Sequence, residues 1–297
     1  MEYRNEQGYN DLIRDVLEHG VEVPNRTGEP CKAIFDAKIV YDTDKQFPFS
    51  TIRPAATRMA FEEFWFFLNG KTQTKELEEK GVKFWVGNTT REFLDSRGLH
   101  NLPEGDMGVA YGSQFRFYGA TTIADIYTPT DQLEQTYKTL RDDPYSRRVL
   151  NTFWNPNESH LMALTPCHHS HQFVVLPDEE GNKCLHLKLI NRSLDAIFGL
   201  SFAVQNYALY QLAMAKLLGY KVGKLSVDLS HVHIYRNQYE YAREILTREY
   251  GKAGTIKITK DLQNLDDLLH MVWEDFHIEG LEVNTKPFVT PRPPMVA

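Results

Sequence analysis

Cysteine is scarce in this chain of 297 residues, which contains only Cys31, Cys167 and Cys184. Three scattered thiols cannot form the disulfide framework of a small secreted protein, so they favour a reducing compartment. Long apolar runs are also missing. The most apolar stretch, residues 59–68, contains two adjacent glutamates, and the polar N-terminus carries no secretory segment. We therefore expect a soluble, cytoplasmic protein that has no membrane partner.

An excess of positive charge is likewise absent, because 40 acidic residues stand against 33 basic ones and give a formal charge of −7. This balance argues against broad binding to nucleic acid, although a few local arginines could still hold a small anion. Repeats, low-complexity tracts and long linkers are missing too. With 42% hydrophobic and 12% aromatic residues, the chain has enough material for a sizeable core. We expect one domain spanning residues 1–297.

Hydrophobic spacing predicts a mixture of helices and strands. The expected helices span residues 8–19, with Asn10 or Asp11 as the cap, about 55–68 and 203–218. The expected strands are two short ones within residues 32–50, a hairpin of residues 172–176 and 185–190, and residues 227–234. Because helices and strands do not alternate regularly, the sequence predicts an α+β fold.

Cys167 stands in the segment Pro-Cys-His-His-Ser-His, which enters a predicted strand. A lone cysteine is most often a small buried apolar residue. The nearby histidines raise metal ligation as an alternative, but no second Cys or His pair stands at zinc-finger spacing, so we expect no metal. The other alternative is an activated thiolate nucleophile, whose pKa would be lowered by cationic neighbours.

Several arginines stand beside predicted strands or in turns. Arg147 and Arg148 precede one strand, Arg192 and Ser193 follow another, and Arg26 lies in a glycine-containing turn. Singly, each is more often a solvated surface charge. Together, their guanidinium groups and a hydroxyl would match the oxygens of a phosphate dianion.

Glu63 lies on the apolar helix predicted for residues 55–68, among aromatic neighbours, with Glu62 as the member of the pair able to face solvent. A carboxylate in such a place is either tied to an arginine or held in a pocket for proton transfer. The local sequence leaves both interpretations open.

Taken together, the chain resembles the thymidylate synthase family from its N-terminal helix nearly to its last residue. The segments that carry the resemblance are Asn25-Arg-Thr-Gly28, Glu63 within Glu-Phe-Trp-Phe-Phe-Leu-Asn-Gly, Phe84-Trp85, Arg91-Glu-Phe-Leu-Asp-Ser96, Gly105-Asp-Met-Gly-Val-Ala-Tyr-Gly112, Arg147-Arg148, Pro166-Cys-His168, Arg192-Ser-Leu-Asp-Ala-Ile-Phe-Gly199 and His233-Ile-Tyr235.

The resemblance implies a role for each matching residue. Cys167 would add to C6 of a pyrimidine nucleoside monophosphate, dUMP or dCMP, and C5 would then attack the methylene of 5,10-methylenetetrahydrofolate. Glu63 would move protons, and Tyr111 and His168 would join the polar network around the base. The positions implied to bind the nucleotide are Arg26, Arg192 and Ser193 at the phosphate, Asn191 and Ala203 near the base, and His233 and Tyr235 at the sugar. The positions implied to bind the folate are Trp85, Asn88, Asp195 and Gly199.

The resemblance also implies an assembly. The fold would be a mixed β-sheet packed with helices, and one face of the sheet would form the interface of a homodimer. Arg147 and Arg148 would reach across this interface into the site of the partner subunit.

The chain departs from the family pattern near the base. Members that methylate dUMP carry an asparagine that pairs with uracil at the position of Ala203, whose methyl group can neither donate nor accept. The usual glutamine before Arg192 is Asn191, the usual proline is Ser201, and the usual aspartate before the histidine motif is His231. Related hydroxymethylases add water where the synthases add hydride. The dCMP-specific ones carry aspartate at the position of Ala203.

Three functions follow, in order of preference. The first is 5-hydroxymethylation of dUMP or dCMP, the second is thymidylate synthesis from dUMP, and the third is a catalytically inactive relative that binds nucleotide or RNA. The retained Cys167, Glu63 and Asp195 speak against the third, because a binding protein needs no nucleophile.

Overall fold

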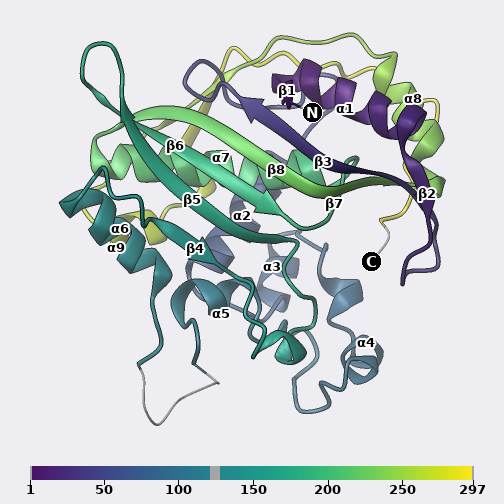
Figure 1. Ribbon diagram of the computed structural model, residues 1–297, viewed down its shortest axis with the longest axis horizontal. Helices are drawn as coiled ribbons and strands as arrows, with labels where there is room; N and C mark the ends of the chain where they lie inside the picture. The colour runs from purple at the N-terminus through teal and green to yellow at the C-terminus, as the bar shows by residue number, and fades with distance from the viewer. Residues whose placement is uncertain (1, 121–127, 296–297) are drawn as a thin grey trace.

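The computed structural model describes residues 2–120 and 128–295, which fold into a large mixed sheet covered by helices (Figure 1). The strands are β1 Glu2–Arg4, β2 Val21–Val23, β3 Cys31–Tyr41, β4 Leu150–Thr152, β5 His168–Pro177, β6 Lys183–Asn191, β7 Leu194–Asp195, β8 Lys221–Tyr235, β9 Thr255–Ile258 and β10 Phe276–Glu279. The helices are α1 Asn5–His19, α2 Thr57–Leu68, α3 Lys75–Glu79, α4 Arg91–Ser96, α5 Tyr111–Arg116, α6 Gln132–Asp142, α7 Gly199–Leu218, α8 Tyr239–Leu246 and α9 Leu265–Leu269. Short 3₁₀ turns span Val86–Asn88, Ser159–Leu161, Arg236–Gln238 and Trp273–Asp275.

The main sheet has the strand order β1-β3-β8-β6-β5-β4, with β2 paired to β3 and β7 paired to β8. β3 and β8 are antiparallel, β6 and β8 are parallel, and β5 and β6 form an antiparallel hairpin. Because strands of both directions share one sheet, the predicted α+β class is confirmed.

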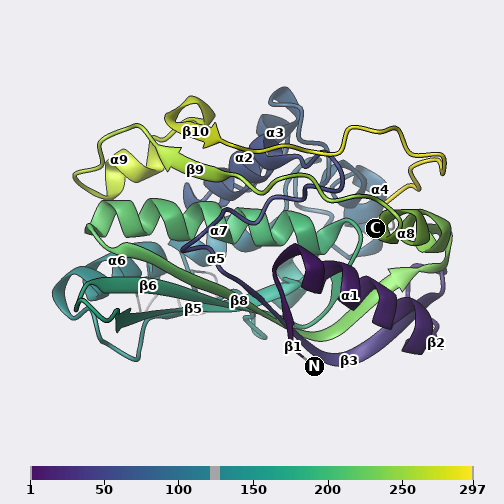
Figure 2. The same cartoon turned by 90° about the horizontal axis from the view of Figure 1, so that it is seen from above.

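Helix α7 lies along one face of this sheet and separates it from α2 and the small β9–β10 sheet (Figure 2). Most residues of α7 are buried, and Tyr207 and Tyr210 are among the largest fully buried side chains. A helix that is apolar on all sides has to be covered on all sides, and here the sheet and α2 supply that cover. The chemistry-bearing side chains of α2 and α7 therefore face each other in the interior.

Two local predictions were wrong. The first helix begins at Asn5 rather than near residue 8, because β1 leads directly into it, and its cap is Arg4. Neither Asn10 nor Asp11 caps the helix. Asn10 is buried, and its amide donates to the Tyr250 hydroxyl over 2.7 Å.

The two short strands expected within residues 32–50 are one continuous strand, β3, followed by irregular chain. Asp36 has a φ of 57° and is skipped in the pairing between β3 and β8. The pairing register is the same on both sides of Asp36, so the break at this residue interrupts the pairing of one strand and does not divide the segment into two strands.

The other expected elements were found; α2 is two residues shorter than expected and the others are longer. The segment 55–68 contains α2, the segment 203–218 belongs to α7, the hairpin is β5–β6, and residues 227–234 lie within β8. In the described parts of the chain, no helix is long and apolar enough to span a membrane.

Val227→Ala tests the packing of β8 against α7. Val227 is fully buried, so removing two methyl groups should lower the free energy of unfolding by about 2 kcal/mol. Val21→Ala is the matched control, because Val21 is 69% exposed and should change stability little. Urea unfolding of both variants measures the difference, and equal effects would contradict this placement of the core.

Candidate active site

One cavity of about 440 Å³ lies beside the N-terminal part of α7 and opens between α2 and the C-terminal segment. The sequence-predicted residues that line it are Glu63, Trp85, Tyr111, Cys167, His168, Asp195, Gly199 and Ala203. They come from distant parts of the chain. A cavity of this size can take a small-molecule ligand.

Cys167 stands just before β5, where hydrogen bonds hold its backbone. Its N–H donates to the Tyr111 hydroxyl over 2.8 Å, and its carbonyl accepts from the Arg192 N–H over 3.0 Å. The Arg192 guanidinium lies 3.7 Å from the Cys167 Sγ and also donates to the carbonyls of Thr165 and Pro166. The thiol and a guanidinium group are therefore fixed side by side at the cavity.

The pKa of Cys167 differs from the sequence-based expectation. Burial raises the pKa of this thiol above its ordinary value, while the positive charges of Arg192 and Arg26 act in the opposite direction without offsetting burial. The predicted cationic neighbours are thus present, but the predicted lowering of the pKa is wrong for this single chain.

Glu63 is buried on α2, and both of its oxygens accept hydrogen bonds. The Trp85 indole N–H donates to Oε1 over 2.7 Å, and the Asn206 amide donates to Oε2 over 2.8 Å. Burial raises the pKa of Glu63 to about 7, although both hydrogen bonds lower it. Of the two interpretations left open by the sequence, the structure therefore favours a carboxyl held in a pocket over one tied to an arginine.

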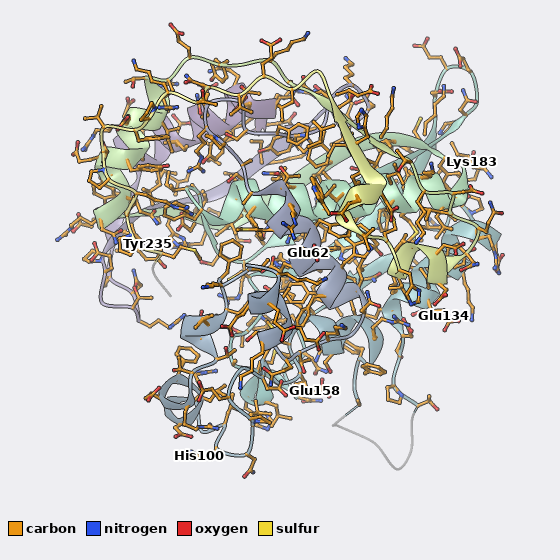
Figure 3. All side chains as sticks on the ribbon, turned by 180° about the vertical axis from the view of Figure 1, so that it is seen from behind. Glu62, His100, Glu134, Glu158, Lys183 and Tyr235 are labelled. Atoms are coloured by element: carbon orange, nitrogen blue, oxygen red, sulfur yellow. The ribbon has the colours of Figure 1, made fainter. Side chains whose placement is uncertain are left out.

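Glu62 has a different environment. Its side chain, labelled in Figure 3, is also largely buried, contrary to the solvent-facing position considered above. It pairs with Lys80 over 2.6 Å. Of the two adjacent glutamates, Glu62 thus forms an ion pair and Glu63 lies in an enclosed pocket.

His168 and Tyr111 pack together on the wall of the cavity. Their rings are stacked with centroids 4.2 Å apart, and the His168 Nδ1 lies 2.9 Å from the Tyr207 hydroxyl. Burial lowers the pKa of His168 to about 3, so its imidazole is neutral at physiological pH. This ring can exchange hydrogen bonds with a ligand without adding charge.

Asp195 lies in β7, next to the first turn of α7. Its Oδ1 accepts from the backbone N–H groups of Ile197 and Phe198, and its Oδ2 accepts from the Gln238 amide. Burial raises the pKa of Asp195 despite these bonds. Gly199 opens α7, and a Cβ there would lie 3.0 Å from a methyl of Leu194, so a side chain would crowd the turn.

The other predicted residues lie outside the cavity lining. Arg26 is exposed in its turn but close enough to act electrostatically on Cys167, and Arg192 and Ser193 are half-buried after β6. Arg147 and Arg148 are exposed before β4 and form no ion pair with any described residue.

His233 and Tyr235 lie near the end of β8, where their rings are 4.9 Å apart (Figure 3 labels Tyr235). Burial, with His231 as a smaller contribution, lowers the pKa of His233 to about 4. Asn88 and Asn191 are buried, and the Asn88 amide nitrogen and both polar atoms of Asn191 find no partner among the described residues.

Sequence reasoning missed part of the cavity wall. The missed residues include Arg53, Phe202, Tyr241, Phe288 and Arg292. Phe288 stacks on Tyr241 with centroids 4.4 Å apart, and the Arg292 guanidinium lies over the Phe198 ring at 5.1 Å. The C-terminal segment has no helical or strand periodicity. Its contact with the cavity is therefore seen only in the structure and was not predictable from the sequence.

These features define an α+β protein whose ligand cavity joins a cysteine, an arginine and a buried carboxyl. The family model of thymidylate synthase matches residues 7–289. Thymidylate synthase of Homo sapiens is 35% identical over 276 residues, covering 92% of this chain and 86% of the relative. Thymidylate synthase of Saccharomyces cerevisiae is 34% identical over 286 residues, covering 93% of each chain. Thymidylate synthase of equine herpesvirus 2 is 34% identical over 280 residues, covering 93% of this chain and 94% of the relative.

The chain therefore belongs to the thymidylate synthase family, as its motifs indicated. It is an enzyme of folate-dependent one-carbon transfer to C5 of a pyrimidine nucleotide, and 5,10-methylenetetrahydrofolate is the one-carbon donor.

Glu63→Gln tests the buried carboxyl through stability. Because the pKa of Glu63 is about 7 rather than 4.5, the folded protein binds this proton more tightly than the unfolded chain does. That contribution to the free energy of unfolding falls as the pH rises from about 4.5 to about 7, by about 3 kcal/mol in total. Glu63→Gln has no such titrating group. Its free energy of unfolding minus that of wild type should therefore rise by up to about 3 kcal/mol between pH 5 and pH 8.

Urea unfolding at both pH values measures the gain. Glu62→Gln is the control, because it removes an ion pair with Lys80 and should gain nothing at pH 8. A stability difference between wild type and Glu63→Gln that is independent of pH would contradict an enclosed Glu63.

Proposed function

We propose that the protein methylates C5 of dUMP, with Cys167 forming a covalent bond to C6 of the base, and that residues 1–297 form one catalytic domain. The observation that carries this proposal is that the Cys167 thiol and the enclosed Glu63 carboxyl line one cavity, while the Arg192 guanidinium lies 3.7 Å from the thiol. The named thymidylate synthases among its relatives support the same reaction.

The chain's own residues account for activation of the base. The Cys167 sulfur, as thiolate, bonds to C6, and the electrons of the C5–C6 double bond move toward C5 and the C4 oxygen. Glu63, with a pKa of about 7, can hold or release a proton at that oxygen near neutral pH. The neutral His168 and the Tyr111 hydroxyl complete the polar surface beside the thiol.

The folate fits the apolar part of the cavity. Phe84 and Phe202 pack edge to face with centroids 4.8 Å apart, and with Trp85 they offer flat apolar walls for an aromatic ring system. Asp195 and Gly199 border this part, and we propose that Asn88, with its unpartnered amide nitrogen, supports it from behind. When bound, the folate supplies carbon at the formaldehyde level and a hydride.

A methyl product requires that water stays away from C5. Trp85 is held in place by its hydrogen bond to Glu63 and by edge-to-face contacts with Phe67 and Tyr111, with centroids 6.0 Å away in each case. A fixed indole excludes water where a mobile one would admit it. This rigid wall supports methylation as the leading function.

Hydroxymethylation was the preferred function on sequence grounds. It is now the second candidate. Ala203 lines the cavity where dUMP-methylating relatives carry an asparagine, and its small methyl group leaves room for a water molecule. Incubation of the enzyme with dUMP, or with dCMP, and methylenetetrahydrofolate separates the two functions. Dihydrofolate and a methylated nucleotide support methylation, whereas a hydroxymethylated nucleotide without folate oxidation would replace our proposal.

We propose that the nucleotide phosphate binds at Arg26, Arg192 and Ser193. Asn191 is proposed to support the base, and His233 and Tyr235 the sugar. Arg147 and Arg148 are exposed and lie outside the cavity lining of their own chain. This supports a homodimer in which the outer face of the sheet is the interface and both arginines serve the partner's phosphate site.

A mass measurement tests the nucleophile. With a 5-fluoropyrimidine nucleotide and the folate, the protein should gain a covalent adduct at Cys167, and Cys167→Ala should abolish the adduct and turnover while sparing nucleotide binding. Arg192→Ala should mainly weaken binding, by about tenfold or more, because a charge-assisted bond to phosphate is lost. Substantial turnover in Cys167→Ala, or no adduct in wild type, would rule out the covalent mechanism; the latter would indicate a nucleotide-binding relative without catalysis.

Mixing two inactive variants tests the shared site. Cys167→Ala and the double variant Arg147→Ala/Arg148→Ala should each be nearly inactive as homodimers. After unfolding and refolding together, a mixed dimer should contain one site with both the thiol and the arginines, so activity should return. Each variant refolded alone is the control. Failure to recover activity, with mixed dimers shown by mass, would contradict donation across the interface.

A further inference from the structure

Asn206 carries a buried oxygen atom that accepts no hydrogen bond from any described residue. It lies on α7, one helical turn after Ala203, is 1% exposed and lines the cavity. Its amide nitrogen donates to Glu63, but its Oδ1 has no partner among the described residues. A buried acceptor without a donor destabilises the protein, so a ligand that donates a hydrogen bond to it would recover this free energy.

The other polar residues near this position have their hydrogen-bonding groups occupied or pointed elsewhere. Gln205 accepts from the Thr57 hydroxyl and donates to the Ser201 carbonyl. His171 is fully buried among aromatic rings and does not line the cavity. His231 lies 3.3 Å from His233 on β8, again outside the lining. Of these residues and Asn206, only Asn206 both lines the cavity and carries a side-chain acceptor without a partner among the described residues.

We propose that Asn206 recognises the N3–C4 edge of the base, in place of the side-chain amide that is missing at Ala203. This inference rests on the proposed function. Residues three apart on a helix are neighbours on one face, with Cβ atoms about 5–6 Å apart, and the small Ala203 leaves the space between Asn206 and the ligand open. The amide function has moved by one helical turn.

Glu63 fixes which way this amide faces. When Glu63 is ionised, its carboxylate only accepts hydrogen bonds, and the Asn206 nitrogen faces it over 2.8 Å. The second N–H and the Oδ1 remain for the ligand. Because Glu63 serves the C4 oxygen in the proposed mechanism, that oxygen lies on the nitrogen side and receives the N–H, while Oδ1 accepts from N3–H.

This orientation selects the base. Uracil presents an acceptor at C4 and a donor at N3, which match the two free groups of Asn206. Cytosine presents an amino group at C4 and an acceptor at N3, so donor would meet donor and acceptor would meet acceptor. Asn206 therefore makes the site specific for a 4-oxo pyrimidine.

Equilibrium binding of dUMP and dCMP to the full-length protein tests this assignment without turnover. Wild type should bind dUMP at least about tenfold more tightly than dCMP, as expected when mismatched polar groups are buried. Asn206→Ser keeps a hydroxyl donor beside Glu63 but is too short to reach the base, so the preference should fall to about threefold or less. Ala203→Asn/Asn206→Ser should restore it by returning an amide at position 203.

A second measurement needs no variant. The N3-methylated form of dUMP lacks the N3–H and should bind wild type at least about tenfold more weakly than dUMP. A preference for dCMP, an unchanged preference in Asn206→Ser, or equal binding of the N3-methylated nucleotide would each overturn the assignment. The covalent adduct at Cys167 is a separate readout, so failure of the catalytic proposal and failure of this one can be told apart.

Discussion

The site depends on a carboxyl group enclosed between two apolar helices. Glu63 on α2 faces α7, and burial alone would disfavour its charge strongly. Two donors from different elements, the indole of Trp85 and the amide of Asn206, compensate part of that cost. The balance leaves the pKa of Glu63 at about 7, where a group can both give and take a proton under physiological conditions. The same two bonds fix the indole that walls the cavity and the amide that we assign to the base.

Charge is separated in space around this centre. Beside the base-binding wall, burial keeps His168 neutral and favours the neutral thiol of Cys167. The cationic groups, Arg26 and Arg192, stand at one side of the thiol, where a phosphate dianion would neutralise them. Arg192 also fixes the loop before Cys167 through the carbonyls of Thr165 and Pro166, so the proposed anion binding and the placement of the proposed nucleophile share one side chain.

The loss of the base-pairing asparagine looks, in sequence, like a loss of uracil recognition. In the structure, Ala203 and Asn206 share one face of α7, and the amide one turn away keeps an acceptor free. Helix geometry lets a function move by a turn without moving the backbone. A methyl group at one position and an amide at the next turn can therefore serve the same edge of a base.

The sequence by itself determined the family, the α+β class and the apolar runs that became α2 and α7, because ordered motifs and hydrophobic periodicity are local properties. It also pointed to Cys167, Glu63, Trp85 and Asp195, all of which line one cavity. Only the tertiary structure decided that β3 is a single strand whose pairing is interrupted at Asp36, that the thiol has a raised pKa, and that the C-terminal Phe288 and Arg292 return to the site. Strand pairing, desolvation and the free oxygen of Asn206 all depend on which distant segments pack together, and no local pattern carries that information.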